Sequence, residues 1–275
     1  MTPKKVIHIA DIHIRNMHRH EEYAEQFDKF FEKCREALGD TPRDEARIVI
    51  AGDLVHSKNT VSNEVYILVS AFIRRLEEIA PVLVISGNHD LVVSNNSRVD
   101  TLTAIFSTAN FQDSTFLDYS LGKQSGCYVD GDVVWALYSI HDDYAYPGVD
   151  SIRVEYPNSK VIGLYHGTVV GAEMPNGTKA SSGLEDDKFS GCDLVMAGHI
   201  HKRQDVYRGG VRVCYPGSLI QQDFGETVSG HGFMVWDLET MEGEFVELES
   251  EYGFYSFEID SETDIDENKE KAVNL

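Results

Sequence analysis

The sequence predicts an α/β protein whose strands are buried on both faces. Five apolar runs rich in Val and Ile each lead directly into Asp, Asn or His, and they occupy residues 6–13, 47–53, 82–90, 160–166 and 193–201. Continuous apolar runs of this kind are typical of strands covered on both sides. Apolar residues at helical spacing lie between the first and second runs and between the second and third. At 275 residues the chain can bury a large core and could form one big α/β domain.

The helical segments have recognisable ends. Apolar residues recur at helical spacing from Tyr23 to Leu38, and Gly39 is a helix stop signal. A second helix is predicted over residues 62–80, halted by Pro81, and a third over about residues 97–108.

Hairpins are expected in the later part of the chain. Asp130-Gly131 is a favoured two-residue turn within residues 127–135. Paired strands are predicted around residues 209–210 and over 233–248, and one more strand follows Gly253.

Polar side chains gather where the five strands end. In open α/β sheets the ligand crevice lies beyond the carboxyl ends of the strands. The residues expected to meet there are Asp11, His13, Asp53, Asn88, His89, His166, His199 and His201. Imidazole, carboxylate and amide oxygen without a thiolate suit manganese, iron or zinc better than calcium or magnesium. A single histidine or aspartate at a strand end could be an isolated core residue. Because all five strands end in such residues, the sequence favours a metal site with a catalytic histidine beside it.

The motifs at these strand ends carry a family resemblance. They are Asp11-Ile12-His13, Gly52-Asp53, Gly87-Asn88-His89-Asp90, His166-Gly167 and Gly198-His199-Ile200-His201. In order and separation they resemble the signature of the calcineurin-like metallophosphoesterases. The resemblance implies a four-layer α-β-β-α sandwich of two mixed sheets flanked by helices.

Two further features resemble one branch of that superfamily. His56 follows Asp53 by three residues, and the segment Tyr215-Pro216-Gly217-Ser218 follows the last motif. Both are similar to the SbcD-type (meiotic-recombination type) DNA repair nucleases, and a phage-type member is one option within that branch.

The resemblance also implies roles for the site residues. Asp11, His13 and His201 would hold one divalent ion, Asn88, His166 and His199 a second, and Asp53 would bridge them. Hydroxide generated between the two ions would attack phosphorus in line. His89 would donate to the phosphoryl oxygen or the leaving group, with Asp90 as its buttress. His56 would place the phosphate or assist His89, and the alternative is a histidine that caps the next segment or faces solvent.

The expected reaction is manganese-dependent hydrolysis of DNA, both exo- and endonucleolytic, in recombination, repair or replication. The alternative is a small-molecule phosphatase or cyclic-nucleotide phosphodiesterase, because fold alone does not select the substrate. A scaffold without catalysis is a third class, but such proteins lose ligands and all seven are present. Arg15 and Arg19 lie in a locally basic loop and are candidate phosphate contacts, or simply solvated residues.

The net charge of −22 argues against a protein that coats nucleic acid, which normally needs a basic surface. The charge is unevenly distributed, however. Residues 237–275 hold 14 Asp or Glu against two Lys, which leaves a net −10 for the rest of the chain. Two bound divalent cations would cancel four more charges in the cleft.

The resemblance and the composition suggest the organisation of the chain. A nuclease domain is expected over residues 1–252, followed by an acidic tail over 253–275, where a DNA-capping domain would begin in SbcD-type nucleases. An SbcC-type ABC ATPase partner and a homodimer formed by the second and third helices are implied, the alternative being helices buried within the fold. No membrane-spanning run or signal peptide is present, and the four scattered cysteines indicate reduced thiols in a cytoplasmic protein.

Overall fold

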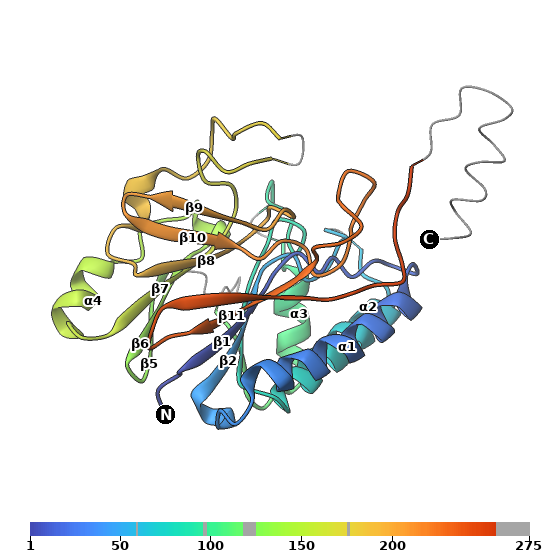
Figure 1. Cartoon of the computed structure of the whole chain (residues 1–275), viewed down its shortest axis with the longest axis horizontal. Coiled ribbons are helices and arrows are strands. Elements are labelled where there is room, and N and C mark those ends of the chain that lie inside the picture. The colour runs from blue at the N-terminus through green and yellow to red at the C-terminus, as the bar shows by residue number, and fades with distance from the viewer. Residues whose placement is uncertain (59, 96–97, 118–124, 175–176, 257–275) are drawn as a thin grey trace, which may run out of the picture.

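Two six-stranded mixed sheets lie face to face in the computed structural model, which describes residues 1–58, 60–95, 98–117, 125–174 and 177–256 (Figure 1). The first sheet contains, in spatial order, β12 (Glu242–Glu247), β11 (Gly232–Asp237), β1 (Lys5–Ile9), β2 (Ala46–Ala51), β3 (Val82–Ile85) and β4 (Ser114–Phe116). The strands β1 to β4 are mutually parallel, and β11 and β12 add an antiparallel edge.

The second sheet repeats this plan. Its spatial order is β5 (Gly126–Asp130), β6 (Val133–Tyr138), β7 (Lys160–His166), β8 (Leu194–Gly198), β10 (Val211–Tyr215) and β9 (Gln204–Arg208). The strands β6, β7, β8 and β10 are parallel, and both edge strands are antiparallel. Each sheet therefore places the carboxyl ends of its parallel strands at one edge.

Helices cover the outer surfaces of the sandwich. They are α1 (His20–Leu38), α2 (Asn63–Glu77), α3 (Thr101–Thr108) and α4 (Val149–Glu155), with short 3-10 turns η1 (Arg43–Glu45), η2 (Ile140–Asp142) and η3 (Asp186–Phe189). Ser62 and Asp100 accept backbone hydrogen bonds from Val65 and Thr103 and so fix where α2 and α3 begin.

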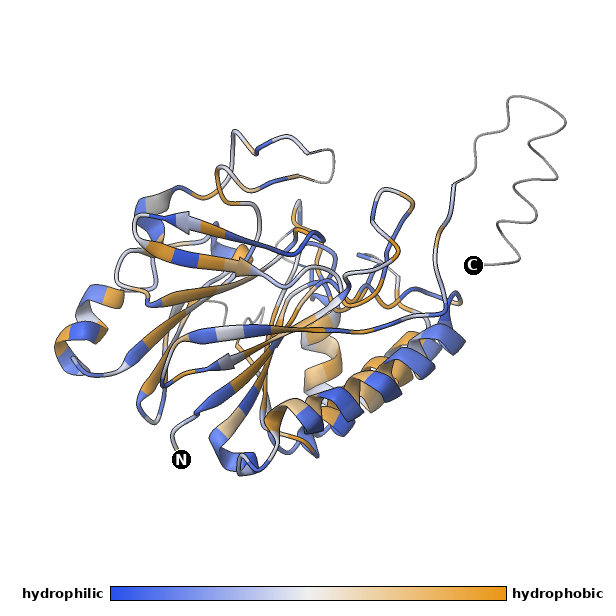
Figure 2. Ribbon diagram, in the orientation of Figure 1, coloured by the Kyte–Doolittle hydropathy of each residue, from blue (hydrophilic) through white to orange (hydrophobic). Residues whose placement is uncertain are grey.

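Three apolar layers hold these elements together, and in Figure 2 hydrophobic residues are concentrated along the strands of the two sheets. Along β1, Ile7 and Ile9 pack under α1 and α2, whereas Val6, and Ala10 just after the strand, face the second sheet. A third cluster lies on the outer face of the second sheet and includes Val149 of α4. The predicted four-layer sandwich is therefore confirmed. His8 shares the parity of Val6 and bonds Ala197 of β8 across the interface, in a structural position.

Some predicted boundaries were wrong. The helix predicted over 62–80 ends at Glu77, and α3 begins at Thr101, while residue 97 lies outside the described residues. The β5–β6 turn is Gly131-Asp132, one residue later than predicted, because Asp130 pairs with Val133 in the ladder.

The apolar side chains of α2 fall into a buried set and an exposed set. Phe72 packs against phenylalanine rings of α1 and Ile73 is buried in the same apolar cluster, whereas Ile67 is 66% exposed. Many of the apolar residues of α2 thus belong to this chain's own core.

The chain's end lies largely outside the described part: residues 253–256 form no strand, and 257–275 are not described. In the part of the chain that the structure describes, no helix is both long and apolar enough to cross a membrane.

Candidate functional site

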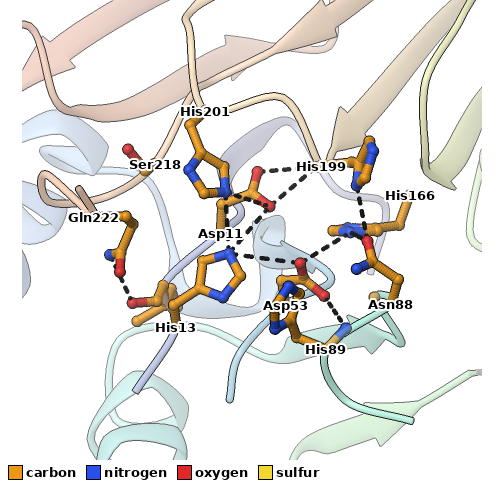
Figure 3. A network of polar contacts seen from close by, with 12 residues as sticks. Asp11, His13, Asp53, Asn88, His89, His166, His199, His201, Ser218 and Gln222 are labelled. Atoms are coloured by element: carbon orange, nitrogen blue, oxygen red, sulfur yellow. Dashed lines mark hydrogen bonds and ion pairs between the residues drawn. The ribbon is translucent and has the colours of Figure 1, made fainter. Parts of the chain in front are cut away.

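The loops that follow five parallel strands converge where the two sheets meet, and Figure 3 shows their side chains pointing toward one another. The first sheet contributes Asp11 and His13 after β1, Asp53 after β2 and Asn88 after β3. The second contributes His166 at the end of β7 and His199 and His201 after β8. The structure thus brings together all seven residues that were predicted to hold metal ions.

Asp53 lies at the centre of this group. Its Oδ2 is 3.5 Å from His13 Nε2 and 3.4 Å from His166 Nε2, so one carboxylate faces both halves of the site. On one side, His201 Nε2 lies 3.9 Å from Asp11 Oδ1 and 3.0 Å from His13 Nε2. On the other side, Asn88 Oδ1 lies 2.8 Å from His199 Nδ1 and 3.3 Å from His166 Nε2.

These atoms have the chemistry of two metal sites that share a carboxylate. Asp11, His13 and His201 form one group of potential ligands, and Asp53, His166 and His199 form another. His166 Nδ1–H donates to the Ala51 carbonyl, which leaves its Nε2 free to bind a cation. The Nε2 atoms of His13 and His201 lie 3.0 Å apart. Their lone pairs would repel each other if neither nitrogen carried a proton, so a proton or a cation must lie between them. The residues present therefore fit a pair of divalent ions.

Burial and the charges of neighbouring groups shift the pKa values of these side chains. Burial alone would raise the pKa of Asp53, but His166 and His13 hold it well below its usual range. Despite burial, Asp53 raises the pKa of His166 to about 9. Burial lowers the pKa of His199 to about 4, with His166 adding to the effect. A cation entering here would therefore displace protons.

The backbone that carries these side chains is strained. Asp11, His13, Asp53 and His199 have φ values of 53°, 51°, 53° and 98°, in the left-handed region that L residues seldom adopt. A Cβ on Gly87 would lie 2.1 Å from Asp53 Oδ1. The glycine before Asn88 therefore lets the third strand end approach the central carboxylate.

His89 and His56 lie beside this centre. His89 Nδ1 bonds the His56 carbonyl at 2.7 Å, and the two rings stack with centroids 5.2 Å apart. Nitrogens of both rings lie within 4.8 Å of a His13 nitrogen.

Arg15 determines the tautomer of His56. Its Nη1 lies 3.3 Å from His56 Nε2, and because arginine only donates, the proton of the neutral ring is on Nδ1. His56 Nδ1 is buried and has no hydrogen-bond partner in the described chain. Burial, together with Arg15 and His89, lowers the pKa of His56 to about 4, so the ring is neutral at neutral pH.

Two predicted roles do not match the contacts. Asp90 was expected to buttress the His89 ring, but its carboxylate instead accepts backbone N–H groups of Leu54, Val55 and Gly87. Arg19 was expected near the phosphate, but it forms a two-pronged ion pair with Glu22 and also donates to the Gln221 carbonyl. Asp90 thus ties two site loops together, and the guanidinium of Arg19 is engaged in contacts within the protein.

The prediction missed polar residues in the segment between β10 and β11. Glu226 accepts from His201 Nδ1 at 2.5 Å, and the Gln222 side chain donates to the Ile12 carbonyl. The Tyr215–Ser218 segment was noted only for its resemblance to the nuclease branch, yet Ser218 pairs with Ala10, next to Asp11. Nothing in the spacing of the sequence singles out Glu226.

A cavity of about 730 Å³ opens on the Asn88–His199 side of the site. Tyr144, Thr168, Met174 and Lys179 contribute to its lining. Its described walls are mostly uncharged, with Lys179 and Asp143 as charged lining residues of opposite sign.

Comparison with known proteins agrees with this architecture. The family model described as calcineurin-like phosphoesterase matches residues 4–203. An uncharacterized protein of Acanthamoeba polyphaga mimivirus is 35% identical over 264 residues, which cover 93% of this chain but only 19% of the viral protein.

Solved structures give weaker matches. The calcineurin-like phosphoesterase YfkN from Bacillus subtilis aligns with a TM-score of 0.49 and 14% identity, over 98% of this chain and 97% of that one. A putative 5′-nucleotidase from Staphylococcus aureus aligns with a TM-score of 0.49 and 14% identity, over 98% and 58% of the two chains. Because the family model covers most of the sequence, including every strand end that supplies a candidate ligand, the chain belongs to the calcineurin-like phosphoesterase family.

Proposed function

We propose that this phosphoesterase hydrolyses phosphodiester bonds in DNA and that manganese is the metal it uses. The main support is His56, a neutral imidazole whose buried Nδ1–H has no partner among the described residues and whose ring centroid lies 5.4 Å from that of the potential ligand His13. An unsatisfied buried donor is costly, and a phosphodiester oxygen would satisfy it. A phosphate monoester or diester bound at the centre would thus gain a hydrogen bond that the metal ligands do not provide.

The chemistry divides between the centre and the residues around it. A pair of divalent ions held by the seven residues would supply Lewis-acid polarisation of a phosphoryl oxygen and activation of water. His56 donates from Nδ1 to a non-bridging oxygen and so orients the phosphorus. Arg15 holds the His56 ring by donating to Nε2, and its second nitrogen bonds the Gln222 carbonyl at 3.0 Å.

His89 is assigned the proton transfer to the departing sugar oxygen. Its Nδ1–H is committed to the His56 carbonyl, so Nε2 is the atom that exchanges the proton. The His89 backbone N–H also donates to Asp53 Oδ1 at 2.7 Å, which fixes this residue relative to the centre. His89 and His56 therefore have separate tasks, proton transfer and placement.

Hydrolysis of a small phosphate ester is the second candidate function, and the adjoining cavity favours it. At about 730 Å³ the cavity has a volume typical of small-molecule sites, and it opens directly beside Asn88 and His199. A mononucleotide or cyclic nucleotide would place its phosphate at the centre and its base in this cavity.

Purified protein with manganese should be incubated with linear duplex DNA, single-stranded DNA, a cyclic nucleotide and p-nitrophenyl phosphate. We expect release of nucleotides or oligonucleotides from DNA, and loss of this activity with a chelator. Turnover of the cyclic nucleotide or the aryl monoester with intact DNA would favour the second candidate. No turnover of any substrate, with manganese shown to be bound, would contradict both.

The partners remain part of this proposal. We propose a homodimer in which the exposed Ile67 of α2 and Val99 beside α3 contribute to the contact. An SbcC-type ATPase is the proposed larger partner, by analogy with the nuclease branch alone.

A further inference from the structure

The carboxylate of Glu226 is the buried charged group whose contacts point most directly at the metal centre. Its side chain is 8% exposed and lies in the segment joining β10 to β11. Oε1 lies 2.5 Å from His201 Nδ1, while Oε2 accepts from the Ser218 hydroxyl and the Gln222 backbone N–H, both at 2.9 Å. Both oxygens are thus occupied, so Glu226 is not free to bind an ion itself.

The contact determines what His201 presents to the site. Because a carboxylate only accepts, His201 must donate from Nδ1, and the remaining nitrogen, Nε2, faces Asp11 Oδ1 at 3.9 Å. Figure 3 shows the ring of His201 between Ser218 and Asp11. His166 receives the same orientation from the neutral Ala51 carbonyl. Only His201, of these two, is oriented by a full negative charge.

Glu226 is itself held in place. Ser218 Oγ also contacts His231 Nδ1 at 3.0 Å, and Ser218 pairs with Ala10, next to Asp11. The carboxylate is therefore anchored to the same strand end that supplies the first ligands, and a shift of the segment would move Glu226 and His201 together.

We propose that Glu226 is a positioning residue for the metal centre: it fixes the tautomer and ring orientation of His201 and increases the basicity of the nitrogen that binds the ion. This inference rests on the proposed metal-dependent function. A carboxylate that orients a ligating histidine typically contributes about 10- to 100-fold in metal affinity.

The test is a manganese titration by isothermal calorimetry of the wild type, Glu226→Gln and a matched control, Glu22→Gln. The glutamine amide keeps the shape but must place its NH₂ opposite either His201 Nδ1 or the Gln222 N–H. Glu22 is also a buried carboxylate, 7% exposed, but its partner is Arg19 rather than a ligand. We expect Glu226→Gln to bind one of two ions about 10- to 100-fold more weakly, with the control unchanged.

A second arm separates positioning from general structural damage. If Glu226 acts through His201, then Glu226→Gln should cause no additional loss of affinity in a His201→Ala background. Thermal unfolding of each metal-free variant in the presence of a chelator would verify that it is folded.

The outcomes are distinguishable. Normal affinity in Glu226→Gln, an equal loss in Glu22→Gln, or additive losses in the double variant would each overturn the role of Glu226 and leave the proposed function standing. A wild-type chain that binds no divalent ion would overturn the metal centre, and this inference with it.

Discussion

Replacing His56 with alanine tests the placement role most directly. Arg15 occupies Nε2 of this ring, and its remaining donor, Nδ1–H, is buried without a partner in the part of the chain that the structure describes. A hydrogen bond to a charged acceptor contributes about 1.5–3 kcal/mol, which corresponds to about a 10- to 150-fold fall in kcat/KM. His56→Asn should recover part of the loss, since its amide nitrogen can lie where Nδ1 lay. Manganese binding should not change, because His56 is outside the seven-residue group.

The assay compares DNA with an aryl phosphodiester for the wild type, His56→Ala, His56→Asn and the exposed-loop control His18→Ala. If His56 only places the phosphate, its loss should lower kcat/KM for DNA and for the aryl phosphodiester to a similar degree. Proton donation to the leaving group would instead impair DNA by about 100- to 10,000-fold and largely spare the aryl ester. Undiminished activity of His56→Ala on both substrates would refute the reasoning, and parallel loss of manganese would show that the effect comes from the metal centre.

Four further predictions concern the centre and the scaffold. Asp53→Asn removes the carboxylate that faces both His13 and His166, so a manganese titration should show weaker binding of both ions, and an activity assay should show that hydrolysis is lost. Two tightly bound ions with normal turnover would contradict this. Gly87→Ala should also impair metal binding, measured in the same titration, because its Cβ must displace Asp53 Oδ1, and wild-type affinity would argue against it. Burial lowers the pKa of His8 to about 3, below its unfolded value of about 6.5, so the free energy of unfolding falls by up to about 5 kcal/mol as the pH drops from 6.5 to 3. Urea unfolding of the metal-free chain at several pH values should show that the free energy of unfolding depends less on pH in His8→Gln than in the wild type. The same pH dependence in both proteins would rule this out. Ile67→Glu should leave the fold intact because the side chain is 66% exposed, and sedimentation should show monomers where the wild type dimerises; an unchanged dimer would place the interface elsewhere.

The strand ends could be predicted because burial and chemistry coincide there. A run such as that of β3 must be apolar to lie between two layers, and polar residues immediately after it can only lie at the sheet edge. This reasoning brought the potential ligands to one place without any knowledge of side-chain direction, and the family resemblance supplied the roles assigned to them.

Side-chain direction is where prediction from sequence failed. Asp90 follows Asn88 and His89, yet its carboxylate turns toward the backbone of Leu54 and Val55. Arg19 has an acidic partner three residues along α1, and that local pair prevails over a distant phosphate. Glu226 lies in an irregular segment with no periodicity, so only the fold shows that it meets His201.

The position of the ligands at the junction between the sheets has a consequence for folding. Each group draws residues from both halves of the sandwich, and His13 and His201 are 188 residues apart in sequence. A bound ion would tie the halves together much as a disulfide does, by closing a very long loop. Loading with metal and docking of the two halves should therefore be one cooperative event. Mutations that weaken sheet packing far from the centre would then appear, in an activity assay, as loss of metal affinity.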